Sequence, residues 1–144
     1  MATAKDILDR KGREVVTMVP GESVLNAARL MNERSIGGIV VAEDDRMVGI
    51  FTERDILRRV VAEQLDPAKT TVGDVMTSPV ISLKSSATLE ECMGLITEKR
   101  VRHLPVLDDD GLEGIVTSGD VLAYQVREQQ DTIEYLHSYV YNPR

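Results

Sequence analysis

The chain reads VVAEDDRMVGIFTERDIL at residues 40–57 and PVLDDDGLEGIVTSGDVL at residues 105–122. Asp55 of the first stretch matches Asp120 of the second, 65 positions further on, and this spacing holds without a gap over all of residues 15–57. Self-similarity of this length is the signature of a duplicated supersecondary unit. We therefore predict two copies of one fold unit.

The hydrophobic pattern of each copy indicates the order β-α-β-β-α. The first copy has a β-prone run at 15–19, a helix with one apolar face at 24–31, two strands within 39–51 and a helix from Thr52. The second copy has the same elements at 80–83, 89–96, 104–116 and from Thr117. Acidic residues between the paired strands are typical of hairpin turns. One unit alone has too little core, so we expect the two to pack face to face.

The repeats divide the chain into three parts. We assign residues 5–64 to the first repeat, 70–126 to the second, and 127–144 to a C-terminal helical tail. Apolar residues recur in and before the tail at the spacing of a coiled-coil seam, at Leu122, Val126, Ile133, Leu136 and Val140, with Gln129 interrupting it. The four tyrosines are here as well, at 124, 135, 139 and 141. Because interfaces favour Tyr, we predict a homodimer; packing of the tail onto its own module is the alternative.

Composition excludes several classes of protein. The chain has 144 residues, 42% of them hydrophobic, and 17 Lys and Arg against 24 Asp and Glu, a net charge of −7. This apolar fraction argues against disorder, and the acidic balance argues against a nucleic-acid or anionic-membrane surface. No stretch approaches the roughly 20 apolar residues of a membrane span, and no signal-peptide core opens the chain. A single cysteine, Cys92, rules out an internal disulfide. We expect a cytoplasmic protein.

Motifs for catalysis are missing from the sequence. The only histidines are His103 and His137, and there is no H-E-x-x-H, paired C-x-x-C, G-x-S-x-G or Walker A loop. The acidic hairpin tips read as solvated turns rather than as cation sites, because they recur at equivalent places in both copies. We therefore predict no enzyme and no metal site.

The motif Thr-x-x-Asp occurs at the same strand-to-helix junction in both copies, at Thr52–Asp55 and Thr117–Asp120. It matches a capping box, in which the Thr side chain and the acidic side chain satisfy each other's backbone N–H groups. The same junction suits a ligand, because a helix N-terminus attracts phosphate and a carboxylate accepts hydrogen bonds from ribose hydroxyls. The residues alone leave both interpretations open.

The doubled unit, with Gly-Ile-(Phe or Val)-Thr-x-x-Asp in each copy, resembles a tandem pair of cystathionine-β-synthase-type (CBS) domains, or Bateman module. The strand entry VRHLPV at residues 101–106 is similar to that of the family as well. The resemblance covers residues 5–126 and implies an α/β (α+β) fold, two β-α-β-β-α repeats packed as a pseudo-twofold disc. It also implies two clefts that bind adenosine nucleotides in many members.

Carried over to this sequence, the resemblance assigns ligand-binding residues to each cleft. In the first, Asp120 holds the ribose, Thr117, Ser118, Arg102 and His103 meet phosphate, and Val16, Gly37, Gly38 and Ile39 line the adenine slot. In the second, Asp55 holds the ribose, Thr52 and Arg54 meet phosphate, and Thr77, Ile81, Val101 and Leu104 form the base slot. Gly37-Gly38 stands opposite Arg102-His103, so the two clefts are expected to differ. A solvent-exposed pair at a strand start is the alternative for Arg102 and His103.

The resemblance implies a non-catalytic, stand-alone regulatory module. We expect it to need no catalytic cofactor, to bind AMP, ADP or ATP as a regulatory ligand, with NAD as a further candidate, and to signal to an effector protein. The alternative is a ligand-independent scaffold or interaction protein in which the Thr-x-x-Asp motifs only cap helices.

Overall fold

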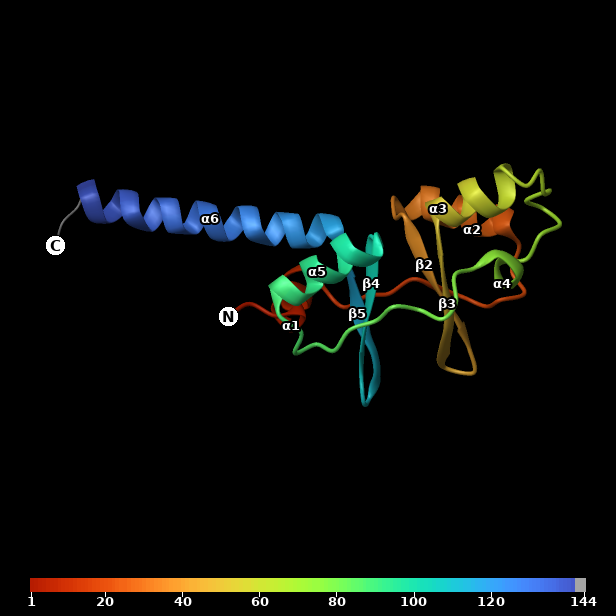
Figure 1. Ribbon diagram of the computed structural model, residues 1–144, viewed down its shortest axis with the longest axis horizontal. Helices are drawn as coiled ribbons and strands as arrows, with labels where there is room; N and C mark the ends of the chain where they lie inside the picture. The colour runs from red at the N-terminus through yellow and green to blue at the C-terminus, as the bar shows by residue number, and fades with distance from the viewer. Residues whose placement is uncertain (142–144) are drawn as a thin grey trace.

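The computed structural model describes residues 1–141 and contains two halves side by side (Figure 1), and the first has the predicted β-α-β-β-α order. The first half consists of β1 (Thr17–Met18), α2 (Val24–Arg34), β2 (Gly38–Glu43), β3 (Arg46–Thr52), α3 (Glu53–Asp55) and the π-helical segment η1 (Ile56–Val61). The second consists of α5 (Leu89–Lys99), β4 (His103–Asp108), β5 (Gly111–Thr117) and α6 (Ser118–Tyr141). The mixed α and β fold with a C-terminal helix is confirmed.

Equivalent positions of the two halves share local structure. Ser35 and Arg100, which end α2 and α5, are both left-handed with φ 53°. Both antiparallel hairpins, β2–β3 and β4–β5, have a register shift at the same place, after Val41 and after Val106. The duplication seen in the sequence is therefore a duplication of backbone geometry.

The first strand of the second copy differs from the prediction. In the first half β1 pairs in parallel with β2, and the Val40 N–H donates to the Val16 carbonyl at 3.1 Å. The equivalent donor in the second half is Pro105, which has no N–H to offer Ile81. Only Leu83 makes a parallel bridge, to Val106, so the strand predicted at 80–83 is wrong.

Two short helices pack in the half that does not contain their sequence repeat. Helix α1 (Ala4–Lys11) lies in the part assigned to the first repeat, yet it packs against β5 and α6, and Ala4, Ile7 and Leu8 are buried in the core of the second half. Helix α4 (Val72–Val75) packs Val72 and Val75 into the core of the first half. The chain thus crosses between halves at both segments, which ties the halves together.

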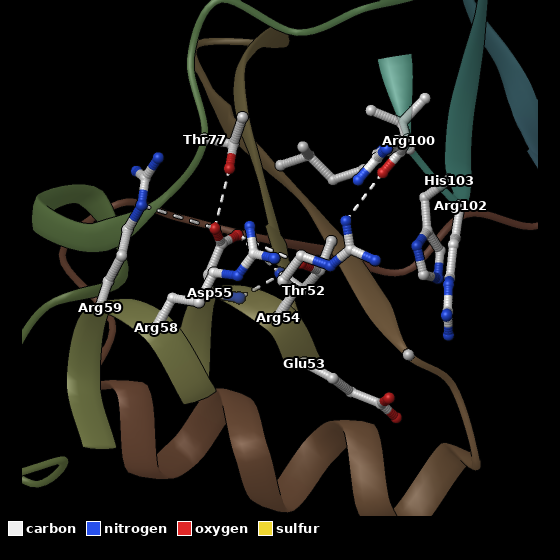
Figure 2. Close-up of a pocket in the computed structure, with 13 residues that line it drawn as sticks. Thr52, Glu53, Arg54, Asp55, Arg58, Arg59, Thr77, Arg100, Arg102 and His103 are labelled. Atoms are coloured by element: carbon white, nitrogen blue, oxygen red, sulfur yellow. Dashed lines mark hydrogen bonds and ion pairs between the residues drawn. The ribbon is translucent and has the colours of Figure 1, made fainter. Parts of the chain in front are cut away.

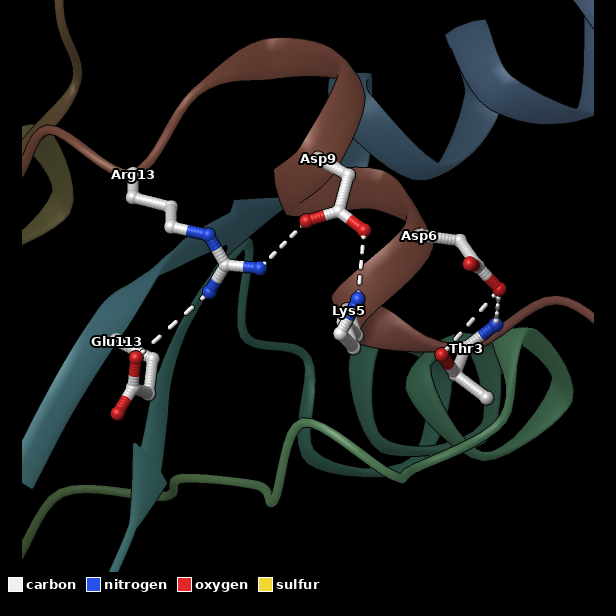
Figure 3. A network of polar contacts seen from close by, with 6 residues as sticks. All are labelled: Thr3, Lys5, Asp6, Asp9, Arg13 and Glu113. Carbon is white, nitrogen blue, oxygen red and sulfur yellow. Dashed lines mark hydrogen bonds and ion pairs between the residues drawn. The ribbon is translucent and has the colours of Figure 1, made fainter. Parts of the chain in front are cut away.

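Helix α1 is held by polar contacts that Figure 3 shows. The Asp6 carboxylate accepts the Thr3 N–H at 2.9 Å, which caps the helix. Arg13, just beyond the helix, pairs with Asp9 and lies 3.7 Å from Glu113 of β5. Lys5 and Arg13 hold the pKa of the Asp9 carboxyl below its usual value.

The C-terminal helix is continuous from the second repeat into the predicted tail. Residues 127–141 of the tail extend α6 without a break, and residues 142–144 lie outside the described part of the chain. Beyond its first turns α6 points away from both halves (Figure 1), so the tail does not pack onto its own module. None of the helices within residues 1–141 is long and apolar enough to cross a membrane.

Candidate functional site

The two halves meet at the entries of β2 and β4, where Gly37-Gly38 faces Arg102-His103. A Cβ added to Gly38 would lie 3.0 Å from His103 Cδ2, and one added to Gly37 would lie 3.3 Å from His103 Nε2. The absence of side chains at the glycines is what admits the imidazole. Two pockets open on either side of this contact, and Gly37, Glu53, Arg102 and His103 line both of them. We call them the Asp55 cleft and the Asp120 cleft.

Each helix that borders a cleft begins with the same backbone hydrogen bond. The Glu53 N–H donates to the Gly37 carbonyl at 3.1 Å, and the Ser118 N–H donates to the Arg102 carbonyl at 2.9 Å. The first free N–H of each helix is therefore satisfied within the protein, which leaves less of the helix N-terminus for a phosphate than the sequence suggests.

The Thr-x-x-Asp motif forms a capping box in both halves. The Thr52 N–H donates to Asp55 Oδ2 at 3.0 Å, while the Asp55 N–H donates to Thr52 Oγ1 at 3.4 Å. The Thr117 N–H donates to Asp120 Oδ2 at 2.9 Å, and the Asp120 N–H donates to Thr117 Oγ1 at 3.1 Å. The capping interpretation is confirmed, and the ribose role of these carboxylates stays a prediction.

Asp55 is only 5% exposed and is the one charged residue in the buried part of the described chain. Besides the capping contacts on Oδ2, its Oδ1 accepts a hydrogen bond of 2.8 Å from the Thr77 hydroxyl and lies 3.8 Å from Arg59 Nε (Figure 2). Both carboxylate oxygens therefore have protein partners.

The Asp55 cleft is rich in arginine. Its cavity of about 210 Å³ is lined by five arginines, at 54, 58, 59, 100 and 102, against the carboxylates of Glu53 and Asp55. Two of the guanidinium groups hold backbone: Arg54 donates to the Arg100 carbonyl at 2.8 Å and Arg59 to the Met76 carbonyl at 2.7 Å. In Figure 2 the Glu53 carboxylate points away from this cluster. The cleft is a cationic surface in a chain of net charge −7.

The Asp120 cleft is wider, about 600 Å³, and balanced in charge. Lys11, Arg34 and Arg102 line it together with Glu14, Glu53 and Asp120. Lys11, from the end of α1, forms an ion pair with Asp120 Oδ2 and donates to the Ile115 carbonyl at 2.8 Å. The Asp120 Oδ1 atom accepts no hydrogen bond from any residue of the described chain.

Burial between the two halves lowers the pKa of His103 below its usual value, with the Glu53 carboxylate acting in the opposite direction. The imidazole is therefore neutral at pH 7. It serves as a hydrogen-bonding and packing group in this state, and a bound anion is the kind of neighbour that favours its protonation.

Most of the predicted ligand-binding residues come together in the clefts. The Asp120 cleft is lined by Asp120, Thr117, Ser118, Arg102, His103, Val16, Gly37 and Gly38, and the Asp55 cleft by Asp55, Thr52, Arg54, Thr77 and Val101. Three do not line them. Ile39 and Leu104 are fully buried in the cores of the first and second halves, and Ile81 packs against the second core.

Sequence reasoning missed Arg58, Arg59, Arg100 and Lys11. Arg58 follows Arg54 by four positions, the spacing that places two side chains on one helix face, so the sequence contained a signal for it. Arg100 is brought in by the left-handed turn that ends α5, and Lys11 by the docking of α1, neither of which was predicted. Among residues 1–141, no three His, Cys, Asp or Glu side chains are grouped as a metal site would need.

Comparison with known proteins gives consistent matches along the chain. The family model for the CBS domain matches twice, at residues 3–62 and 72–127. A mitochondrial CBS domain-containing protein of Arabidopsis thaliana, CBSX3, is 31% identical over 147 residues, which cover 96% of this chain and 71% of that protein. The CBS domain-containing protein YhcV of Bacillus subtilis is 32% identical, covering 90% and 89%. A putative signal-transduction protein with CBS domains from Burkholderia ambifaria superposes with a TM-score of 0.86 at 38% identity, covering 89% and 96%.

Proposed function

Because the chain belongs to the CBS-domain family, whose paired domains are generally regulatory and often bind nucleotides, we propose that it is a non-catalytic module that binds an adenosine phosphate between its two repeats. The ligand class is AMP, ADP or ATP, with NAD as a further candidate. The module signals through an effector protein whose affinity depends on the bound ligand, which requires a reciprocal coupling between the two sites.

The observation that carries this proposal is the arginine cluster of the Asp55 cleft. Guanidinium groups bind phosphate with paired, charge-assisted hydrogen bonds, and five of them around one small cavity repel one another unless an anion lies between them. The side chains of Arg58, Arg100 and Arg102 donate no hydrogen bond to any other described residue. These three are the donors available to a phosphate chain.

The adenosine part is proposed to bind against the residues predicted for each base slot. In the Asp55 cleft Thr77 and Val101 line the wall, and a ribose hydroxyl would replace the Thr77 hydroxyl as donor to Asp55. In the Asp120 cleft the ribose hydroxyls would donate to the Asp120 Oδ1 atom, with Val16 and Gly38 on the base side. The charge difference between the clefts supports a different phosphate content for the two ligands.

The experiment is a thermal-shift and calorimetry series with adenosine, AMP, ADP and ATP on protein refolded from denaturant to remove carried-over ligand. A ligand that binds only the folded state raises the free energy of unfolding by mass action, by about 2.7 kcal/mol at a ligand concentration of 100 times its Kd. The melting temperature rises as a result. We expect affinity to rise with the number of phosphates. Arg58→Gln and Arg100→Gln should each weaken binding about tenfold, since a hydrogen bond to a charged group contributes about 1.5–3 kcal/mol.

The matched control is Arg46→Gln, the same change on the β2–β3 hairpin and outside both clefts. It should leave every affinity unchanged. If neither these four compounds nor NAD shifts the melting curve of ligand-free protein, the proposal is wrong. The second candidate, a ligand-independent interaction protein, is favoured by the complete capping boxes, and it predicts this flat result.

We further propose that the module works as a homodimer. The tyrosine-bearing and apolar surface of α6 supports this assembly.

A further inference from the structure

Helix α6 exposes a long apolar surface to solvent. Beyond its first turns it leaves the body of the molecule (Figure 1), and Ile133, Leu136 and Val140 are 64%, 54% and 65% exposed. Tyr135 and Tyr139 are about 70% exposed on the same segment. Side chains of this size are rarely exposed together on a monomeric protein.

The pattern along the helix is that of a pairing seam. Leu122, Val126, Gln129, Ile133, Leu136 and Val140 alternate at spacings of four and three, so they form one stripe. The flanking positions hold no Asp, Glu, Lys or Arg; they are Ala123, Gln125, Gln130, Thr132, His137 and Tyr139. All four charged residues between the ends of the seam, Arg127, Glu128, Asp131 and Glu134, lie on the other faces. A second copy of this helix would therefore meet no like charge across the seam.

The N-terminal half of the seam borders a groove along α1. The groove is lined by Ile7, Arg10, Leu122 and Val126, with Arg10 stacked 4.9 Å over the Tyr124 ring. It combines apolar side chains with the basic last turn of α1. The negative end of a helix dipole and an apolar helix face are the complement of such a groove. The C-terminal half of α6 has both properties.

We propose that α6 pairs antiparallel with α6 of a second copy of this chain. In this arrangement Val126 lies opposite Leu136 of the second copy, and Leu122 lies opposite its Val140. Each C-terminal half of α6 then occupies the groove of the other molecule. A single twofold axis therefore buries both the seam and the groove of each chain. A parallel pair would leave both grooves empty. The inference names the surface of the homodimer proposed above and does not depend on nucleotide binding.

The first test is the oligomeric state, by sedimentation velocity and light scattering on the full chain across a hundredfold concentration range. We expect twice the chain mass of 16.0 kDa at the upper concentrations. Ile133→Glu should raise the dimer Kd by roughly 100-fold, because it places an unpaired charge in the seam of both chains. The control, Ser138→Glu, adds the same charge to the same helix outside the seam and flanking positions, and should leave the Kd unchanged.

The second test is the orientation, by disulfide formation under mild oxidation. The native Cys92 is fully buried and stays unreacted in the folded protein. A mixture of Val126→Cys and Leu136→Cys chains should yield a covalent heterodimer, whereas Val126→Cys alone should stay monomeric on a non-reducing gel. Efficient crosslinking of Val126→Cys alone would show a parallel pair and overturn the proposal.

Two other results would also overturn it: a monomer at every concentration, or a dimer that Ile133→Glu leaves intact. Adenosine-phosphate affinity measured on the Ile133→Glu protein separates this inference from the proposed function. If the protein binds nucleotide but forms no dimer, only the α6 pairing is rejected. If it forms dimers but binds no nucleotide, only the proposed ligand is rejected.

Discussion

The imidazole of His103 lies against the backbone of Gly38, with Cδ2 3.0 Å from the place that a Cβ on that glycine would take. The two residues occupy the same position of the duplicated unit, 65 residues apart. The pseudo-twofold symmetry is therefore broken where the halves meet, since one side supplies a ring and the other supplies the space for it. Because both clefts include His103 in their walls, this contact defines the shape of each.

A methyl group at position 38 should strain this contact. In Gly38→Ala the new Cβ is within 3.0 to 3.2 Å of three imidazole atoms, and overpacking of this kind costs about 1–3 kcal/mol. We expect a lower urea midpoint with an unchanged m-value. The control is Gly94→Ala in α5, where nothing lies within 4 Å of the added Cβ. That change should raise stability by about 0.5–1 kcal/mol, because alanine favours the helix interior. Equal effects of both changes would contradict the packing argument.

Stability should depend on pH through His103. Burial lowers its folded pKa below the ordinary value of 6.5, so at pH values just under 6.5 the unfolded chain binds more protons than the folded one. The contribution of the neutral ring is therefore fully present above pH 6.5 and is lost as the pH falls from there toward the folded pKa. The charged groups that act on the ring are Glu53, Lys11, Asp120 and Arg102.

The measurement for His103 is the urea midpoint between pH 7.5 and 5.5. The unchanged protein should lose stability across this range, and His103→Gln should flatten the dependence. His137→Gln removes the other histidine and is the matched comparison. A slope that survives in His103→Gln and disappears in His137→Gln would assign the effect to the tail.

Asp55 and Asp120 should differ as structural residues when no ligand is present. Asp55→Ala removes a cap and leaves the Thr77 hydroxyl without its acceptor in a buried site, at a combined cost of about 2–4 kcal/mol. The Asp120 carboxylate is 23% exposed, so Asp120→Ala, which removes a cap and the half-exposed ion pair with Lys11, should cost about 1 kcal/mol. Chemical denaturation of ligand-free protein tests both values. Equal costs would show that the Thr77 contact contributes nothing to stability.

This difference decides how ligand experiments are read. Loss of binding in Asp55→Ala is informative only at temperatures where the variant is folded, whereas Asp120→Ala stays close to the parent protein in stability. A ribose role for Asp120 would appear as a reduced adenosine affinity without a matching loss of ligand-free stability.

The repeat in the sequence predicted most of the fold because the same hydrophobic spacing produces the same elements twice. It also predicted a strand at 80–83, which does not form. The sequence contained the reason, because Pro105 has no N–H and so lacks the hydrogen-bond donor that Val40 supplies in the first half. It also placed Asp55 and Asp120 at equivalent junctions, and both do cap helices there.

Two of the residues that line the clefts could not be placed there from the repeat. Arg100 enters the Asp55 cleft through a left-handed residue, and Lys11 enters the Asp120 cleft because α1 docks on the second half. Periodicity says which side chains are buried but not which half buries them. A local signal for α1 was present, since Thr3 and Asp6 repeat the Thr-x-x-Asp spacing and form a capping box.

The docking of α1 can be tested at Leu8, which is fully buried in the core of the second half. Leu8→Ala should cost about 2–5 kcal/mol, as for other large-to-small changes in a core, whereas Lys5→Ala on the exposed face should change little. The Leu8 Cδ2 atom lies 2.7 Å from the Cβ position of Gly114 on β5, so Gly114→Ala should destabilise the protein by itself.

In the double variant the truncated residue 8 leaves room for the new methyl group. The combined cost of Leu8→Ala and Gly114→Ala should therefore be smaller than the sum of the two single costs by about 0.5–3 kcal/mol, the coupling expected of residues in contact. Urea denaturation of the four proteins measures it. Strict additivity would mean that α1 does not lie on β5 in solution. The packing of α1 in the second half would then be wrong.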